Sequence, residues 1–331
     1  MKKFVFYTLL LAFVASFSFT GCKYDDECDC LSSEPLAYET LTTYLKSVDM
    51  NLDKIMTNAD GQKFVMFPAD GDLSSKYIID IRSAEAFGSG HIDGAHNVAF
   101  TNILTEAAKA DKPIVVVCFT GQTACYATSL LRLYGYENAQ ALKWGMSGWN
   151  PGFDSWTSNC KELTNSTNWT TSATSAGNFE APSWTSNSTN GADILKERVE
   201  AVVAAGFKTV KNTDVLANPA DYYINNYFSD AHYTGFGHVN GAVRISPLLI
   251  DNCSSLDPSK KVVTYCYTGQ TSAVITAYLN VLGFDAYSLT FGVNGMAHSN
   301  SFWSTGGTDG GAVPNHWGVN AGSKDFPVVT N

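Results

Sequence analysis

The chain contains one short segment twice, and this repetition constrains the fold more than any other feature. Cys118-Phe119-Thr120-Gly121-Gln122-Thr123-Ala124 returns as Cys266-Tyr267-Thr268-Gly269-Gln270-Thr271-Ser272. Each copy follows a run rich in β-branched residues, 113–117 and 261–265, and precedes a segment with helical apolar spacing. The pattern predicts a buried strand, a glycine-containing loop and a helix, built twice.

A loop of this kind is a place to hold negative charge. Backbone N–H groups of the loop and of the first helical turn point inward, and the helix dipole adds partial positive charge. Gly121 and Gly269 permit the turn that aims those amides, and the Thr and Gln side chains of each loop offer uncharged hydrogen bonds. We therefore expect Cys118 and Cys266 to have a lowered pKa and to act as nucleophiles at neutral pH. The alternative is that each is a buried cysteine that only packs.

A second signature lies upstream of each loop. In the first half it reads Asp80-Ile81-Arg82-Ser83-Ala84-Glu85-Ala86-Phe87, followed by Gly90-His91-Ile92-Asp93-Gly94-Ala95. The second half has Gly237-His238-Val239-Asn240-Gly241-Ala242, but Asn225 and Tyr227 replace Asp80 and Arg82. Together the signatures resemble those of the rhodanese (sulfurtransferase) family, whose active-site cysteine begins a short loop between a central strand and a helix.

The resemblance implies catalysis by Cys118 and Cys266, with the six residues after each cysteine forming the substrate-binding loop. Each thiolate would take the outer sulfur of a small-molecule donor (thiosulfate, polysulfide or mercaptopyruvate), become a persulfide, and pass the sulfur to a thiol or cyanide. A protein thiol is a further acceptor that the sequence leaves open. No cofactor is implied. The rival hypothesis is a non-catalytic module that binds a partner or carries sulfane sulfur as a sensor.

The loops also exclude a related chemistry. Phosphatases of this fold place an arginine six positions beyond the cysteine, because a phosphate dianion needs its fork of donors. This chain has Ala124 and Ser272 there, and neither loop contains Arg or Lys. Phosphatase and arsenate-reductase activities are therefore disfavoured, and the sulfur donor stays undetermined.

Four further residues are expected to support the loops. Arg82 should pair with a nearby carboxylate such as Glu85 and, with Asp80, orient the end of a strand. His91 and His238 lie in glycine-flanked turns, and we interpret them as hydrogen-bonding turn residues rather than as bases or metal ligands. No metal-ligand spacing occurs in the sequence.

The N-terminus carries targeting signals. Residues 1–21 combine a basic start with an apolar run and end at Phe19-Thr20-Gly21-Cys22, which resembles a bacterial lipobox with Cys22 as the acylated residue. Residues 22–35 form a tether whose Lys23-Tyr24-Asp25-Asp26-Glu27 is similar to export tags of Bacteroidetes lipoproteins. We expect a lipid anchor in the outer membrane of a Gram-negative bacterium, at the periplasmic face or the cell surface. An ordinary cleaved signal peptide is the alternative.

The repeat predicts two tandem rhodanese-like α/β domains, each a mostly parallel sheet with helices on both faces. Residues 150–190 have the composition of a linker, yet Trp156 and Trp169 recur as Trp303 and Trp317. We therefore predict a packed, loop-rich extension after each domain, with domains at 36–182 and 183–331. The repeated tryptophans favour packing over carbohydrate stacking.

Charge and cysteine usage bound the remaining options. The net charge of −10, without a basic cluster, disfavours nucleic acid as a partner. Of eight cysteines, only the loop cysteine recurs in both halves, and a disulfide framework would normally be copied with its domain. The pairing of the others stays open; they are Cys28, Cys30, Cys125, Cys160 and Cys253.

Overall fold

The first half of the protein folds around a parallel sheet. The structure is a computed structural model that describes residues 36–330. The sheet has five strands in the order β1-β5-β4-β2-β3, and all neighbouring strands run parallel. These strands are β1 (Val65–Met66), β2 (Tyr77–Asp80), β3 (His96–Asn97), β4 (Ile114–Val117) and β5 (Gln140–Leu142).

The second half repeats this design with a four-stranded parallel sheet in the order β7-β11-β10-β8. Its strands are β7 (Thr209–Val210), β8 (Tyr222–Asn226), β10 (Lys261–Tyr265) and β11 (Ala286–Leu289). A separate antiparallel pair joins β6 (Trp169–Thr170) to β9 (His238–Val239). The expected doubled, mostly parallel α/β fold is confirmed.

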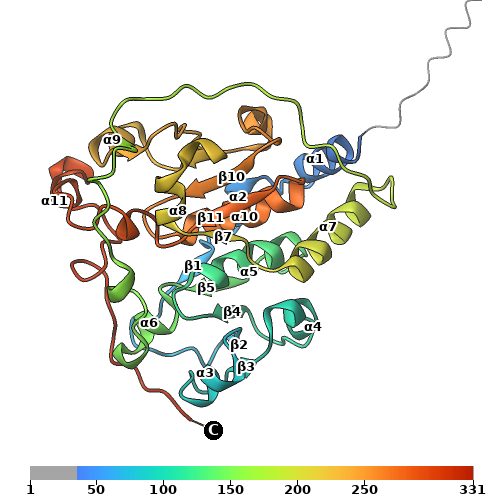
Figure 1. The fold of residues 1–331 in the computed structure, drawn as a ribbon. Helices are drawn as coiled ribbons and strands as arrows, with labels where there is room; N and C mark the ends of the chain where they lie inside the picture. The colour runs from blue at the N-terminus through green and yellow to red at the C-terminus, as the bar shows by residue number, and fades with distance from the viewer. Residues whose placement is uncertain (1–35, 331) are drawn as a thin grey trace, which may run out of the picture. The chain divides into compact units, whose positions relative to one another are not determined.

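Helices surround both sheets (Figure 1). In the first half they are α1 (Ala37–Ser47), α2 (Leu52–Met56), α3 (Ala84–Gly88), α4 (Ile103–Ala107), α5 (Gln122–Leu133) and α6 (Gly145–Trp149). In the second half they are α7 (Gly191–Ala205), α8 (Asn212–Ala217), α9 (Asp230–Gly235), α10 (Gln270–Leu282) and α11 (Phe302–Thr305). None of the helices within 36–330 is both long and apolar enough to cross a membrane.

The two halves share one core. Helices α5 and α10, which follow the two cysteine loops, lie side by side between the sheets (Figure 1). Along β4, Ile114 and Val116 face this shared core, while Val115 and Val117 face a separate cluster on the outer side of the sheet. Alternating side chains of a strand point to opposite faces, so each sheet is covered on both sides. The shared core extends into the second half through residues such as Val262.

The extension of each half crosses to the other half. After α6, residues 161–174 run along the second half, where β6 pairs with β9 and Glu162 pairs with Ala297 (Figure 1). In return, the C-terminal segment runs along the first half, where the backbones of Val329 and His91 exchange hydrogen bonds of 2.9 Å. Each sheet's outer face is therefore covered partly by chain from the other half.

This exchange corrects the prediction that each extension packs onto its own domain. The predicted packing of the tryptophans is confirmed, since Trp156, Trp303 and Trp317 are buried. Trp303 packs within its own half, against Phe236 and His316, whereas Trp317 packs against the first half. Trp317 packs against Trp144 and Trp156, with ring centroids 5.3 and 5.5 Å away. The boundary near residue 182 stays a prediction, since both halves lie in one compact unit.

Candidate functional site

The Cys118 loop joins the carboxyl end of β4 to the start of α5. All four residues of β4 are buried, so the strand holds the loop at a fixed place in the sheet. Gly121 caps α5 with φ = 83°, a conformation that glycine adopts without a Cβ penalty. The predicted sequence of strand, glycine turn and helix is confirmed here, and Gly269 (φ = 76°) repeats it at α10.

Backbone amides converge on the sulfur of Cys118. The N–H of Gly121 donates to Cys118 Sγ over 3.1 Å and the N–H of Ala124 over 3.3 Å. Both donors belong to the loop and the first turn of α5, as expected from the sequence. The arrangement stabilises negative charge on the sulfur, whether on a thiolate or on a persulfide.

The expected lowering of the Cys118 pKa is wrong for this conformation. The side chain is only 5% exposed, and burial raises the pKa of the thiol because charge is costly away from water. Amide hydrogen bonds from Ala124, Thr120 and Gly121 lower the pKa, whereas the charge of Asp80 raises it; burial outweighs the amides. The cradle is thus formed, but the thiol inside it stays protonated at neutral pH.

A glycine turn closes on the loop from behind. Met146 N–H donates to the Cys118 carbonyl over 2.8 Å, and Ser147 donates to the Phe119 carbonyl through its N–H (2.9 Å) and its hydroxyl (2.8 Å). A Cβ on Gly145 would lie 2.3 Å from the Cys118 carbonyl oxygen. Ser147 was not among the predicted site residues. Its turn does recur in sequence, as Trp144-Gly145 and Phe291-Gly292.

Arg82 and Asp80 form a buried ion pair beside the loop. Arg82 Nη2 lies 2.6 Å from Asp80 Oδ2 and donates to the Gly90 carbonyl over 2.8 Å. The carboxylate that pairs with Arg82 is therefore Asp80, and the expected Glu85 is exposed instead. The guanidinium lies over the Phe119 ring and over the Phe153 ring, 5.4 Å from each centroid. Arg82 thus supports the first loop residue, Phe119, which is 41% exposed.

The two predicted turn histidines are placed as expected. His91 Nδ1 hydrogen-bonds to the Phe87 carbonyl over 3.0 Å, and its ring stacks on Phe87. His238 Nδ1 hydrogen-bonds to the Tyr233 carbonyl over 2.9 Å, and its Nε2 to the Ser172 carbonyl over 3.0 Å. Ser172 belongs to the extension of the first half, so His238 also anchors the exchanged segment.

The Cys266 loop has the same fold but fewer donors on its sulfur. Ser272 N–H donates to Cys266 Sγ over 3.4 Å, and the Ser272 hydroxyl lies 3.8 Å away. Cys266 is 2% exposed. At the position of the Asp80 carboxylate, Asn225 accepts from the Ile245 N–H over 2.9 Å. The buried ion pair of the first half therefore has no equivalent at Asn225 and Tyr227.

The second loop is also closed by a contact that the first lacks. Tyr267, which corresponds to Phe119, hydrogen-bonds to His232 Nδ1 over 2.5 Å and stacks on Phe228 at 4.5 Å. His232 Nε2 in turn hydrogen-bonds to the Gly306 carbonyl over 2.8 Å. His232 was missed by the sequence reasoning, because it lies far from the loop in sequence and outside both signatures. The two loops therefore share a backbone conformation but differ in the side chains that pack on the residue after the cysteine.

The two loops touch one another. Gln270 Nε2 donates to the Thr120 carbonyl over 3.1 Å, and Gln122 Oε1 accepts from the Phe291 N–H over 2.8 Å. Within the loops, Gln122 Nε2 donates to Thr120 Oγ1 over 3.1 Å, and Thr268 Oγ1 accepts from the Gln270 N–H over 3.2 Å. Thr123 and Thr271 are half-buried in the first turns of α5 and α10. These glutamines, expected from the sequence to offer uncharged hydrogen bonds, connect the two halves.

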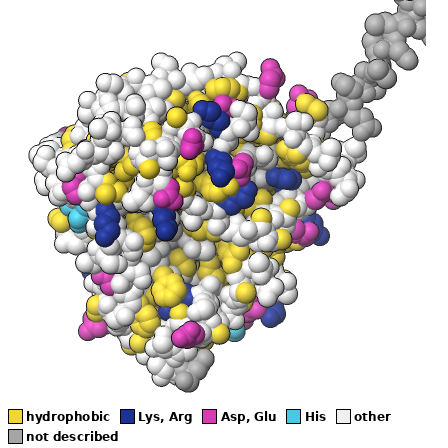
Figure 2. Space-filling model, viewed as in Figure 1, with side chains coloured by type: hydrophobic (Ala, Val, Ile, Leu, Met, Phe, Trp, Pro, Cys, Tyr) yellow, Lys and Arg dark blue, Asp and Glu magenta, His cyan; other side chains and the backbone are white. Residues whose placement is uncertain are grey.

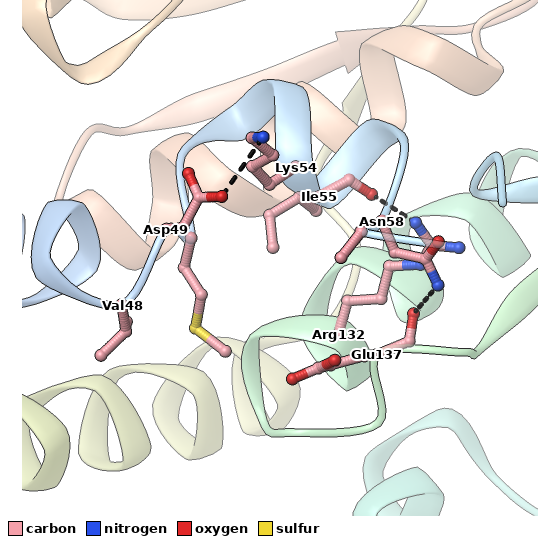
Figure 3. A pocket seen from close by; sticks show the side chains of 9 residues that line it. Val48, Asp49, Lys54, Ile55, Asn58, Arg132 and Glu137 are labelled. Atoms are coloured by element: carbon pink, nitrogen blue, oxygen red, sulfur yellow. Dashed lines mark hydrogen bonds and ion pairs between the residues drawn. The ribbon is translucent and has the colours of Figure 1, made fainter. Parts of the chain in front are cut away.

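The other places that could bind a ligand lack the cysteine loops. A cavity of about 130 Å³ is lined by residues of α2, of α5 and of the turns beside them, and no residue of either cysteine loop lines it (Figure 3). There Arg132 bonds backbone carbonyls, including those of Ile55 and Ala139. Within 36–330 no group of three or more metal-binding side chains lies together.

The remaining predictions concern thiols and charge. In the described part of the chain, Cys125, Cys160 and Cys253 are free thiols, as are both loop cysteines. Cys22, Cys28 and Cys30 lie outside the described residues. Acidic and basic side chains are interspersed on the face shown in Figure 2.

Comparisons with known proteins match both halves to one family. The family model described as a rhodanese-like domain matches residues 68–151 and 226–299. The thiosulfate sulfurtransferase GlpE of Shewanella oneidensis is 36% identical over 81 residues, which are 24% of this chain and 80% of that protein. GlpE of Pseudoalteromonas translucida is 29% identical over 84 residues, 25% of this chain and 80% of that protein. A solved thiosulfate sulfurtransferase from Pseudomonas aeruginosa is 20% identical with a TM-score of 0.25, covering 65% of this chain and 39% of that one.

Proposed function

Because the chain belongs to the rhodanese family, we propose that it is a sulfurtransferase that carries sulfur as a persulfide on Cys118. The observation that supports this most directly is the convergence of the Gly121 and Ala124 amides on Cys118 Sγ, at 3.1 and 3.3 Å. Such a cradle stabilises negative sulfur species, and it lies at the carboxyl end of a central parallel strand.

The proposed reaction has two balanced steps. With thiosulfate as donor, the Cys118 thiolate attacks the outer sulfur; a sulfur–sulfur bond forms to the cysteine, and the donor's sulfur–sulfur bond breaks to release sulfite. In the second step, a thiolate or cyanide attacks the outer sulfur of the persulfide, and the Cys118 thiolate returns. The loop amides would stabilise the negative charge on the attacking thiolate and on the persulfide. With polysulfide, the donor's terminal sulfur–sulfur bond breaks and a shorter polysulfide leaves. With mercaptopyruvate, the carbon–sulfur bond breaks and pyruvate leaves as its enolate, which takes up a proton.

Access to the sulfur requires movement of its cover, because Cys118 is 5% exposed. Phe119 is the exposed residue of this loop, and its ring lies over Arg82 rather than in a closed aromatic cluster. In the second half Tyr267 is held by His232 and Phe228. We therefore assign the main sulfur-transfer activity to Cys118 and a lesser one to Cys266.

The second candidate function is a sulfane-sulfur carrier or sensor without turnover. The burial of both sulfur atoms favours it, because a sealed persulfide would be protected from acceptors. A carrier would gain sulfur and keep it, whereas an enzyme would release it to an added acceptor.

Mass spectrometry separates these functions. The protein is incubated with thiosulfate, polysulfide or mercaptopyruvate, and its intact mass is measured before and after cyanide or a thiol is added. We expect a gain of one sulfur atom in the parent and in Cys266→Ser, its loss on addition of acceptor, and little gain in Cys118→Ser. Sulfur that persists after acceptor would favour the carrier; no gain with any donor would refute both.

The proposed place of action is the outer membrane, with Cys22 lipidated. The support is the sequence around Cys22, which lies outside the described residues. A bacterial host fed an alkyne-tagged fatty acid should yield labelled protein in the membrane fraction, and Cys22→Ala should lose the label. Fatty-acid label on the Cys22→Ala variant, or its absence from the parent protein, would contradict lipidation at Cys22.

A further inference from the structure

We propose that Gln270, contributed by the second half, is a positioning residue for sulfur transfer at Cys118 in the first half. It holds the peptide that joins Thr120 to Gly121, and the N–H of this peptide is one of the amides that donate to the Cys118 sulfur. The inference rests on the proposed function of Cys118 and adds a role for the second half of the molecule.

The argument begins with the geometry of one peptide. Gln270 Nε2 donates to the Thr120 carbonyl over 3.1 Å, and the N–H of the same peptide, on Gly121, donates to Cys118 Sγ over 3.1 Å. The peptide is planar and trans, so its C=O and N–H point in opposite directions. A donor that fixes the carbonyl therefore also aims the N–H at the sulfur.

The surroundings leave this carbonyl little other support. Its second donor is Trp156 Nε1, at 3.2 Å, which comes from the extension of the first half. Gln270 is 3% exposed, so water does not replace its amide easily. A Cβ on Gly121 would lie 2.8 Å from Gln270 Nε2, which shows how closely the second loop approaches the first. The Thr120 carbonyl therefore accepts from two side chains, one from each half.

The contact is not reciprocal. Gln122, at the matching position of the first loop, accepts from the Phe291 N–H rather than donating to the second loop. Trp303, which matches Trp156, donates to the Ala297 carbonyl. On the Cys266 sulfur the described amide donor is that of Ser272, at 3.4 Å. The peptide whose carbonyl is held by side chains, and the sulfur with more amide donors, therefore both belong to the first half.

The pH dependence of Cys118 alkylation tests this without any sulfur donor. Full-length protein is treated with iodoacetamide across a pH series, and alkylated Cys118 is quantified by peptide mapping. The midpoint of the rate profile reports the thiol pKa, whereas a change in access alters only the plateau. Loss of one hydrogen bond to the peptide should raise the midpoint by about half a unit to one unit.

Three substitutions define the outcome. Gln270→Glu replaces the donor by an acceptor of the same shape and should give the largest upward shift. Gln270→Met keeps the volume, removes the donor and should give a smaller shift; it also serves if the glutamate variant does not fold. Trp156→Phe removes the other donor to the same carbonyl and should shift the midpoint in the same direction.

The matched control is Ser129→Ala. Ser129 Oγ donates to the Val274 carbonyl over 3.1 Å, so it too makes a side-chain bond across the two halves, but farther along α5 from the loop. We expect no shift of the midpoint there. An unchanged midpoint in folded Gln270→Met, or an equal shift in Ser129→Ala, would overturn the inference.

A parallel assay separates this failure from failure of the proposed function. Sulfur loading from thiosulfate should fall several-fold in kcat with little change in KM for Gln270→Met. If the alkylation midpoint shifts but the parent loads no sulfur, the positioning is correct and the sulfurtransferase proposal is wrong. If the parent loads sulfur and Gln270→Met matches it in both assays, the sulfurtransferase proposal stands and the positioning role is refuted.

Discussion

At the scale of single residues, Cys118 shows two opposing effects acting on one thiol. Amide donors at 3.1 and 3.3 Å favour the thiolate, and burial favours the neutral thiol. Burial wins in the closed conformation. An opening that brings water to the sulfur while keeping the amides in place would reverse the balance, so reactivity depends on the cover of the loop.

The first prediction concerns pH. Because burial raises the pKa of the Cys118 thiol, the thiolate fraction at pH 7 is small and should grow as pH rises. The rate of sulfur loading should therefore increase through pH 8.5, about where an unperturbed cysteine titrates. Stopped-flow or quenched assays in the Cys266→Ser background would measure this. A rate that is already constant above pH 7 would show that the reacting conformation has a lowered pKa.

The second prediction concerns Gly145, which has φ = 60°. Alanine there would meet the Cys118 carbonyl oxygen at 2.3 Å and adopt a left-handed conformation that costs about 1–2 kcal/mol by itself. Gly145→Ala should lower the melting temperature and reduce sulfur loading, because the clash displaces the carbonyl of Cys118 itself.

Gly61→Ala is the matched control. Gly61 has φ = 76° and no atom within 4 Å of the added Cβ, so alanine there carries the cost of a left-handed residue without the clash. Equal loss of stability in the two variants, with normal sulfur loading by Gly145→Ala, would contradict a role for the turn in shaping the loop.

At the scale of elements, the exchanged extensions explain a pattern that composition alone would miss. Residues 161–174 and the segment that ends at Val329 have few regular strands, yet both make backbone hydrogen bonds with the opposite half. Their side chains complete the outer faces of the sheets: Trp169 packs with the second-half cluster and Phe326 with the first-half cluster. The extensions are therefore structural parts of the partner sheet.

The third prediction tests this exchange. Trp317 belongs to the second half by sequence but packs on Trp144 and Trp156. Trp317→Ala should destabilise by about 3–5 kcal/mol and raise amide hydrogen exchange around residues 144–160, in the first half. In the control variant Trp303→Ala, whose ring contacts Phe236 and His316, exchange should rise in the second half. If amide hydrogen exchange rose only in the second half for both variants, the packing of the second-half extension on the first half would be contradicted.

How much could be predicted from sequence depended on the range of the interactions. The strands, the glycine caps and the inward amides follow from local patterns, and the repeat confirmed each pattern with a second copy. Asp80 was recognised as a structural residue. That Arg82 pairs with Asp80, and not with Glu85, depends on which side chains are buried together. The pKa of Cys118 was mispredicted because burial is a property of the whole fold. Which half an extension packs on is likewise invisible in a repeat whose two copies have the same landmarks.

At the scale of the whole molecule, the two halves complete one another at three places. Helices α5 and α10 pack within one shared hydrophobic cluster, the extensions are exchanged, and the glutamines of the loops bond across the junction. A half produced alone would expose the apolar face of its helix and one face of its sheet, and would lack the extension that covers the other. Burial of apolar surface is the main driving force for folding, so these losses are large.

The fourth prediction follows from that dependence. Fragments 36–182 and 183–331 expressed separately should be aggregated or should lack a cooperative thermal transition. Co-expressed, they should form a one-to-one complex with a single transition and should recover sulfur loading at Cys118. The uncut chain, carried through the same steps, is the control for expression. Two fragments that each melt cooperatively as monomers, with Cys118 loading sulfur in the first alone, would show that the halves are independent and that the contacts across the junction, including that of Gln270, are dispensable.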